Sequence, residues 1–195
     1  MKQNLIPFER VIEEMKTAIS DTLTIDKDKI TPDSSLIKDL GAESLDFLDI
    51  NYRLEQAFGI KMARHFIIEH IEEMFGEGTA VDSNGQLTET AVKLMKIRLS
   101  AGKEAGESFD ELIPGMDMDA LPAMVTVKSM SMAVMDILDS LPQKCPACGA
   151  SSWKTDDGTH VICGGCSAEA PYENGDDLIK NWLEKTQKDH NIIKS

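Results

Sequence analysis

Four cysteines near the end of the chain have the residue type and the spacing of a metal site. They form two CxxC pairs, Cys145 with Cys148 and Cys163 with Cys166, and 14 residues separate the pairs. Each pair can form a tight turn that directs two thiolates toward one ion, and Zn²⁺ accepts four thiolates in closed structural sites. A redox-active CxxC is the alternative, but it leaves the second pair unexplained and lacks a surrounding βαβ pattern. The spacing therefore predicts a structural zinc site.

The segment between the cysteine pairs predicts a β-hairpin. Strand-like residues 152–154 and 159–162 flank Asp156-Asp157-Gly158, whose composition is typical of a turn. A hairpin that carries two CxxC turns is a zinc ribbon, a fold that binds DNA, RNA or protein. Residues 145–195 carry five basic and eight acidic side chains. Because this segment is acidic, protein docking is the favoured role of the ribbon.

A serine at the start of a predicted helix is the second candidate for chemistry. Ser44 opens a helical pattern that ends at Gly59. A helix N-terminus offers free backbone N–H groups and the positive end of the helix dipole, a setting that favours an attached phosphate diester. A serine before an acidic first turn is also ordinary helix capping. The position alone therefore leaves both interpretations open.

A serine hydrolase is a poor explanation for Ser44. The sequence around it, Gly-Ala-Glu-Ser-Leu, lacks the Gly-x-Ser-x-Gly elbow of α/β-hydrolases. The chain contains four histidines, none in a recognisable serine-histidine-acid order: His65, His70, His160 and His190. We therefore expect no catalytic residues in this protein.

Apolar periodicity predicts a mainly α fold that positions these residues. Apolar side chains recur at three- and four-residue steps over 7–23, 44–58, 63–75, 87–101, 126–141 and 176–188. Residues 24–40 mix turn formers with isolated apolar residues, as an ordered loop does. Six of the eleven methionines lie between Met116 and Met135. They can fill an irregular helical core or line an adaptable pocket for an acyl chain, and the sequence does not decide between these roles.

The residues around Ser44 resemble the acyl carrier protein family. The match runs from Asp33 to Ile60 without a gap. The family pattern of leucine-glycine-alanine, an acidic residue, the modified serine, leucine and aspartate is matched by Leu40, Gly41, Ala42, Glu43, Ser44, Leu45 and Asp46. The resemblance implies that a phosphopantetheinyl transferase, which needs Mg²⁺, attaches 4'-phosphopantetheine covalently to Ser44.

The resemblance also implies that helix 44–58 is recognised by partner enzymes with basic docking faces. Glu43 stands where the family more often has aspartate. The residues expected to contact partners are Glu43, Leu45, Asp46, Leu48, Asp49, Tyr52 and Glu55. The partners implied are acyl-transferring or synthase enzymes, and fatty acid, polyketide, lipid-modification and peptide pathways all stay open. The alternative is a carrier-like interaction protein that is never pantetheinylated and docks through its ribbon.

The predicted architecture has two domains. Thr126-Val127 resembles the step that opens the last helix of the family, but it arrives some 55 residues late. We therefore expect an acyl-carrier-like four-helix bundle over 1–142 with a helical insertion at about 63–119. A small β zinc ribbon with a terminal helix should follow over 143–195.

The composition limits the partners and the location. The chain has 34 acidic and 20 basic side chains and a formal net charge of -14. This excess of carboxylates disfavours nucleic acid and favours partners with basic surfaces. No apolar run approaches the roughly 20 residues of a membrane span, and residues 1–7 do not form a signal core. We expect a cytoplasmic protein.

Overall fold

The computed structural model describes residues 3–100 and 110–193. Their packing divides the chain into two compact units: unit 1 contains Met1–Met62 and Ala123–Gly175, and unit 2 contains Ala63–Pro122 and Asp176–Ser195. Residues 101–109 of the predicted insertion, including the end of the helix expected over 87–101, lie outside the described residues. Unit 1 thus combines most of the predicted helical bundle with the cysteine-bearing segment, and unit 2 combines the predicted insertion with the terminal helix. The sequence predicts that 1–142 and 143–195 are separate domains, and this stays a prediction.

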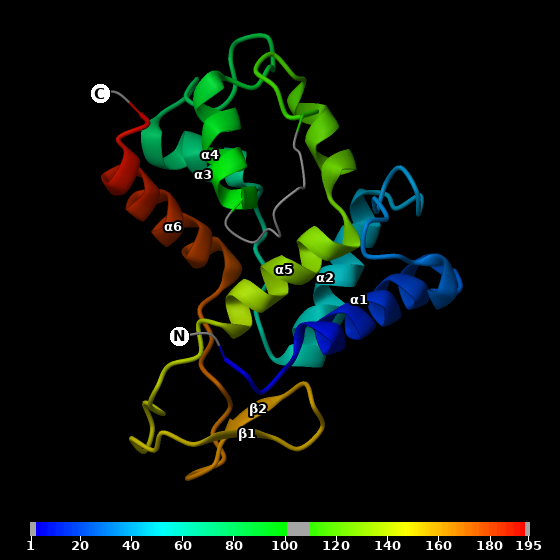
Figure 1. The fold of residues 1–195 in the computed structure, drawn as a ribbon, viewed down its shortest axis with the longest axis vertical. Helices are drawn as coiled ribbons and strands as arrows, with labels where there is room; N and C mark the ends of the chain where they lie inside the picture. The colour runs from blue at the N-terminus through cyan, green and yellow to red at the C-terminus, as the bar shows by residue number, and fades with distance from the viewer. Residues whose placement is uncertain (1–2, 101–109, 194–195) are drawn as a thin grey trace. The chain divides into compact units, whose positions relative to one another are not determined.

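Three α-helices form the core of the described part of unit 1. They are α1 (Phe8–Leu23), α2 (Ser44–Phe58) and α5 (Val127–Leu138). Helix α1 packs against both α2 and α5, as Figure 1 shows. The side chains buried between them come from the predicted apolar stripes: Val11, Met15, Ile19, Ile50, Leu54, Phe58, Val127, Val134 and Leu138. Their removal from water is the main stabilising contribution to this unit.

The loop before α2 is fixed to the start of α5, which positions Ser44. Ser35 and Thr126 form an isolated antiparallel bridge, and the Leu36 N–H donates to the Val125 carbonyl over 3.0 Å. Leu36 is fully buried, and its carbonyl accepts the Ala42 N–H at 2.8 Å. A loop with buried anchors and backbone pairing is ordered. Helix α2 therefore begins at a defined place.

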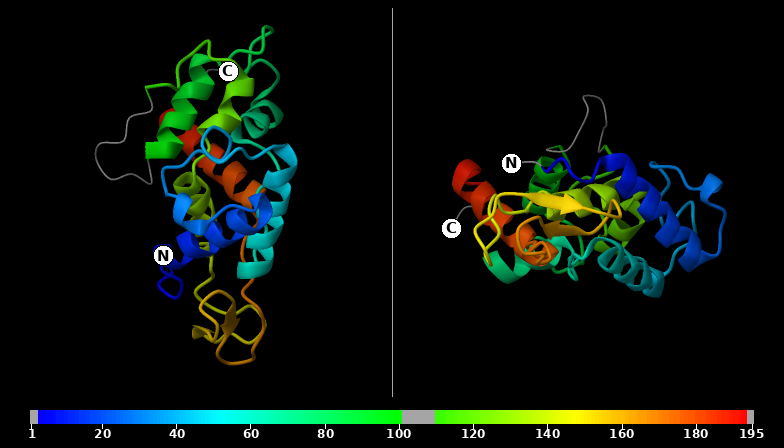
Figure 2. Two further views of the ribbon diagram at one scale, coloured as in Figure 1. Left: turned by 90° about the vertical axis from the view of Figure 1, so that its right-hand side faces the viewer. Right: turned by 90° about the horizontal axis from the view of Figure 1, so that it is seen from below.

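A short antiparallel hairpin completes unit 1. Strands β1 (Trp153–Thr155) and β2 (Val161–Cys163) lie side by side in a hairpin, which is visible in the right-hand view of Figure 2. They pair with Trp153 opposite Cys163. The Asp157 carboxylate accepts the backbone N–H groups of Thr159 and His160 at 2.9 and 2.8 Å, which closes the turn. The hairpin predicted between the cysteine pairs is confirmed.

Unit 2 contains α3 (Ile67–Phe75), α4 (Glu89–Ser100) and all but the first residue of α6 (Gly175–His190). The chain leads back to unit 1 through a 3₁₀ helix, Met118–Met124. Helices α3 and α4 contact each other. The Glu72 carboxylate accepts N–H groups from Gly78, Ala80 and Val81 at 2.6–2.8 Å, so α3 also fixes the loop that follows it.

The predicted start of α3 at residue 63 is wrong by four residues. The N–H groups of Arg64 and His65 donate to the Asp176 carboxylate instead of entering a helix, and the Phe66 N–H donates to Glu69 Oε2 at 2.6 Å. These acceptors satisfy the backbone just before the first turn, so the helix begins at Ile67. Otherwise the mainly α fold with a small two-stranded sheet is confirmed.

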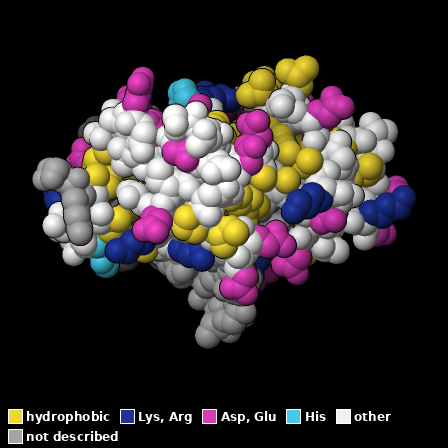
Figure 3. Space-filling model, turned by 90° about the horizontal axis from the view of Figure 1, so that it is seen from above, with side chains coloured by type: hydrophobic (Ala, Val, Ile, Leu, Met, Phe, Trp, Pro, Cys, Tyr) yellow, Lys and Arg dark blue, Asp and Glu magenta, His cyan; other side chains and the backbone are white. Residues whose placement is uncertain are grey.

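Charged side chains are dispersed over one face of the molecule. On the face shown in Figure 3, Asp and Glu lie among neutral residues, with Lys and Arg between them. None of the helices in the described ranges combines the length and the apolar character needed to cross a lipid bilayer.

Candidate modification and metal sites

Ser44 is the first residue of α2 and is exposed to solvent. Gly41, three residues earlier, has φ +73°, a left-handed conformation that turns the chain into the helix and that glycine adopts without strain. The Asp46 carboxylate accepts the Glu43 N–H at 2.7 Å and stabilises the first turn. The serine hydroxyl is thus presented at an ordered helix N-terminus, where backbone N–H groups favour an attached phosphate.

Apolar side chains beside Ser44 are exposed along one side of α2. Leu45, Leu48 and Tyr52 are 78, 55 and 58 % exposed. Their spacing of three and four residues places them in a row along the helix. We call them the α2 apolar row. Large exposed apolar side chains in a contiguous row are a common feature of protein-docking surfaces.

The carboxylate of Asp49 is already paired within the chain. Arg53 Nε lies 2.8 Å from Asp49 Oδ2, and the Thr22 hydroxyl donates to the same oxygen at 2.6 Å. The hydrogen bond from Arg53, followed by that from Thr22, lowers the pKa of Asp49. A partner that uses Asp49 therefore meets a carboxylate whose charge Arg53 partly balances.

The expectation that Glu55 lies on the exposed face of α2 is wrong. Glu55 is only 4 % exposed, and its Oε1 accepts the Met62 N–H at 2.9 Å. Its other oxygen lies 3.9 Å from Lys61 Nζ. Glu55 thus fixes the chain that leaves α2, because a buried backbone N–H needs an acceptor. Six of the seven expected contact residues keep a place on the accessible part of the helix: Glu43, Leu45, Asp46, Leu48, Asp49 and Tyr52.

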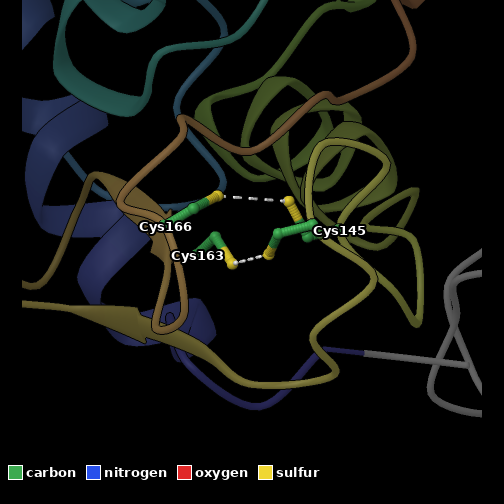
Figure 4. A group of neighbouring side chains, drawn as sticks. Cys145, Cys163 and Cys166 are labelled. Atoms are coloured by element: carbon green, nitrogen blue, oxygen red, sulfur yellow. Dashed lines mark hydrogen bonds between the residues drawn. The ribbon is translucent and has the colours of Figure 1, made fainter.

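The four cysteine side chains point toward one another, and Figure 4 labels three of them, Cys145, Cys163 and Cys166. Their sulfur atoms all lie within 4.8 Å of one another. Cys145 Sγ is 3.8 Å from Cys166 Sγ, and Cys148 Sγ is 3.5 Å from Cys163 Sγ. Four thiolates bound to Zn²⁺ at about 2.3 Å in a tetrahedron are separated by about 3.8 Å. The donor set and its spacing therefore fit a zinc ion.

The two CxxC turns have the same backbone structure. Cys145 N–H donates to the Ala150 carbonyl at 2.8 Å, and Cys163 N–H donates to the Ala168 carbonyl at 2.8 Å. In both turns the residue after the second cysteine has positive φ, +75° for Gly149 and +60° for Ser167. Ser167 therefore adopts a conformation that costs an L-residue about 1–2 kcal/mol.

We expect Ser167→Gly to stabilise the ribbon, because glycine removes this strain. After allowance for the greater flexibility of glycine when unfolded, the gain is about 0.5–1 kcal/mol. The midpoint of thermal unfolding at a fixed zinc concentration should rise. Gly149→Ser, the same exchange in the opposite direction at the matching position, is the control and should lower the midpoint. A lower midpoint for Ser167→Gly would contradict the equivalence of the two turns.

Hydrogen bonds shift the pKa values of two of the thiols, Cys163 and Cys148, in opposite directions. Backbone N–H groups of Cys166 and Gly165 lower the pKa of the Cys163 thiol to about 7. A backbone hydrogen bond from Ala150 lowers the pKa of Cys148. The contacts with the Cys166 and Cys163 thiols outweigh this effect, and the net result is a pKa raised to about 12. Thiolates this close together repel one another unless a cation lies between them. The cluster thus has the chemistry of a metal site.

Within unit 1, hydrogen bonds connect the ribbon to α2 and to the segment that follows α5. His160 Nε2 lies 3.0 Å from the Gln56 carbonyl in the last turn of α2, and His160 Nδ1 lies 2.8 Å from Asp157 Oδ2. Trp153 Nε1 donates to the Pro142 carbonyl at 2.8 Å. No local sequence pattern predicts these contacts, because each joins residues whose proximity depends on the fold.

A helical unit that presents an exposed serine at the start of its second helix is the arrangement of a carrier protein. The family model described as "Phosphopantetheine attachment site" matches residues 13–74, a stretch that continues into α3. The chain is 36 % identical over 55 residues to an acyl carrier protein of Coprothermobacter proteolyticus, covering 28 % of this chain and 67 % of that protein. We conclude that the chain belongs to the acyl carrier protein family.

Other relatives share the same segment. Acyl carrier protein AcpXL of Brucella melitensis is 50 % identical over 50 residues, which are 26 % of this chain and 54 % of that protein. An acyl carrier protein of Thermotoga maritima is 39 % identical over 54 residues, 28 % of this chain and 67 % of that protein. The match thus spans about half the length of the Brucella melitensis protein. No solved structure matches this chain significantly.

Proposed function

We propose that this protein carries acyl groups as thioesters on a 4'-phosphopantetheine arm attached to Ser44. The observation that carries the proposal is the exposed position of Ser44 as the first residue of α2, inside the segment that matches the family. A phosphopantetheinyl transferase would transfer the arm from coenzyme A to the Ser44 hydroxyl. The protein itself would supply only that nucleophile and no catalytic group.

The arm would give the bound acyl group reach and reactivity. Its terminal thiol forms a thioester, which is activated for attack at the carbonyl and for deprotonation at the adjacent carbon. Tethering to a small ordered unit raises the effective concentration of the acyl group at each partner enzyme. Partners with basic docking faces complement the net charge of -14. We place these partners in a specialised lipid or polyketide-type pathway in the cytoplasm.

We further propose that the four cysteines hold Zn²⁺ and that the ribbon helps to dock partners. The bond between His160 and the last turn of α2 supports this role. A partner on the α2 apolar row could contact the ribbon as well, because the hairpin turn is fixed at the far end of the same helix. The ion would contribute structure only, since all four of its positions are filled by thiolates.

The proposed carrier function predicts a gain in mass. Purified protein incubated with coenzyme A, Mg²⁺ and a phosphopantetheinyl transferase should gain one phosphopantetheinyl group by intact-mass spectrometry. With acyl-coenzyme A in place of coenzyme A, the attached arm should carry the acyl group as a thioester that hydroxylamine cleaves. No gain with several transferases would favour the carrier-like interaction protein that is never modified.

We expect Leu48→Ala to slow modification without unfolding the protein. The side chain is largely exposed, so its loss should change stability by no more than about 0.5 kcal/mol. If Leu48 is a docking contact, kcat/KM of the transferase should fall about 10-fold or more, as truncation of an apolar anchor does. Ile113→Ala, which truncates an apolar side chain of similar exposure in unit 2, is the control. Equal rates for both variants would show that the α2 apolar row is not used by this partner.

A further inference from the structure

Unit 2 contains a cluster of two histidines and an aspartate that the carrier function does not use. His65 precedes α3, His70 lies within α3, and Asp176 lies in the first turn of α6. One donor atom from each residue lies within 4.8 Å of the others. His70 Nε2 is 2.9 Å and His65 Nδ1 is 3.5 Å from the same oxygen, Asp176 Oδ1. We propose that this cluster is a second metal site, for a divalent first-row transition ion such as Zn²⁺.

The donors suit such an ion. Imidazole nitrogen and carboxylate oxygen bind Zn²⁺ at about 2.0–2.2 Å, and three protein ligands leave one position for water or another small ligand. Donors at that bond length around a tetrahedral ion are about 3.4 Å apart. The separations of 2.9 and 3.5 Å are close to this value. A small rotation of the two histidine side chains would make room for the ion.

The surroundings of His70 and Asp176 hold both groups in place. Arg64 and His65 donate their backbone N–H groups to the Asp176 carboxylate at 3.1–3.2 Å. His70 is 2 % exposed, and its second nitrogen, Nδ1, is buried without a hydrogen bond. A buried nitrogen left without a hydrogen bond is destabilising, so a purely structural histidine would be expected to pair it.

A carboxylate stands near that second nitrogen. Glu73 Oε2 lies 3.7 Å from His70 Nδ1, and Lys180 Nζ holds the Glu73 carboxylate at 2.9–3.0 Å. Metal-binding histidines commonly direct their other N–H to a carboxylate, which fixes the ring and makes the ligating nitrogen more basic. Ion binding at Nε2 would place a proton on Nδ1 and draw Glu73 into a hydrogen bond. The cluster thus has ligands and an outer partner.

Binding would join two segments that are far apart in the sequence, the start of α3 and the start of α6. Between them lie more than 100 residues, as the separation of 111 between His65 and Asp176 shows. An ion that binds the folded state and not the unfolded chain stabilises it by mass action. Zinc should therefore stabilise unit 2 independently of the ribbon.

The test is zinc stoichiometry of the full-length protein, measured by equilibrium dialysis and metal analysis. The wild-type protein should bind two Zn²⁺, and His65→Ala should bind one. His65 is exposed, so its loss removes a ligand without opening the core. Glu73→Gln should still bind the second ion, but with an affinity about 10–100-fold lower. His190→Ala, which removes a histidine from the end of α6, is the control and should still bind two.

Asp176→Asn provides an independent check, because the amide keeps a hydrogen-bond acceptor but loses the charge. It should also bind one ion, and its thermal unfolding midpoint should no longer rise when zinc exceeds one equivalent. A single ion bound equally by the wild-type protein and by His65→Ala would overturn the proposal. Two ions bound to both His65→Ala and Asp176→Asn would place the second ion elsewhere and overturn it equally.

Discussion

Ser44→Ala is expected to abolish phosphopantetheinylation completely, whereas the wild-type protein gains one group for each chain. The hydroxyl is the nucleophile in the proposed transfer, and alanine has no atom that can replace it. The effect is therefore a total loss of product and not a reduced rate. Intact-mass spectrometry after incubation with coenzyme A, Mg²⁺ and a transferase measures it directly.

The substitution should leave the fold unchanged, which makes a negative result interpretable. Ser44 is exposed at the first position of α2, and alanine is the best helix former. The far-UV circular dichroism and the unfolding midpoint should match those of the wild type, within about 0.5 kcal/mol of stability. Ser83→Ala, at an exposed loop serine in unit 2, is the control and should be modified normally. Modification that persists in Ser44→Ala would assign the arm to another residue.

The sequence predicts α2 well because its signals are local. Ile50, Leu54 and Phe58 repeat every four residues and are all buried, and Gly59 ends the helix with φ +66°. Helix α3 begins four residues later than the periodicity indicates. Its N-terminal backbone donates to Asp176, which is more than 100 residues away in the sequence. No local pattern can reveal an acceptor that only the fold brings close.

The candidate sites divide in the same way. The cysteine cluster can be predicted from spacing alone, because each CxxC pair forms its turn with neighbouring residues in the sequence. Glu55 has the charge of a surface residue, yet the Met62 N–H needs its carboxylate in the interior. The cluster of His65, His70 and Asp176 also has no signature in the sequence. Its two histidines are five residues apart, and its aspartate comes from another segment of the chain.

Removal of the zinc ion proposed for the ribbon is expected to unfold the hairpin and to leave α1, α2 and α5 folded. The hairpin has two strands of three residues, and its buried apolar side chains include Val161 and Ala170, too few to hold it together alone. Structural zinc contributes an apparent binding free energy of about 10–16 kcal/mol in zinc-finger peptides, which small domains use for folding. Emission from Trp153 in a Trp182→Phe background should shift to the red when a chelator is added, because Trp153 and Trp182 are the only tryptophans.

The carrier helices should survive this loss because their core does not include the ribbon. The hydrogen bonds from Trp153 to Pro142 and from His160 to Gln56 would be lost, at a cost of about 1–3 kcal/mol together. Helical circular dichroism should therefore largely remain, and Ser44 should still be modified. Cys166→Ser, which removes one thiolate and leaves His65 and Asp176 intact, separates the ribbon from the site proposed in unit 2. Loss of the whole helical signal in this variant would contradict a domain boundary near residue 142, and an unchanged Trp153 emission would contradict a structural zinc ion.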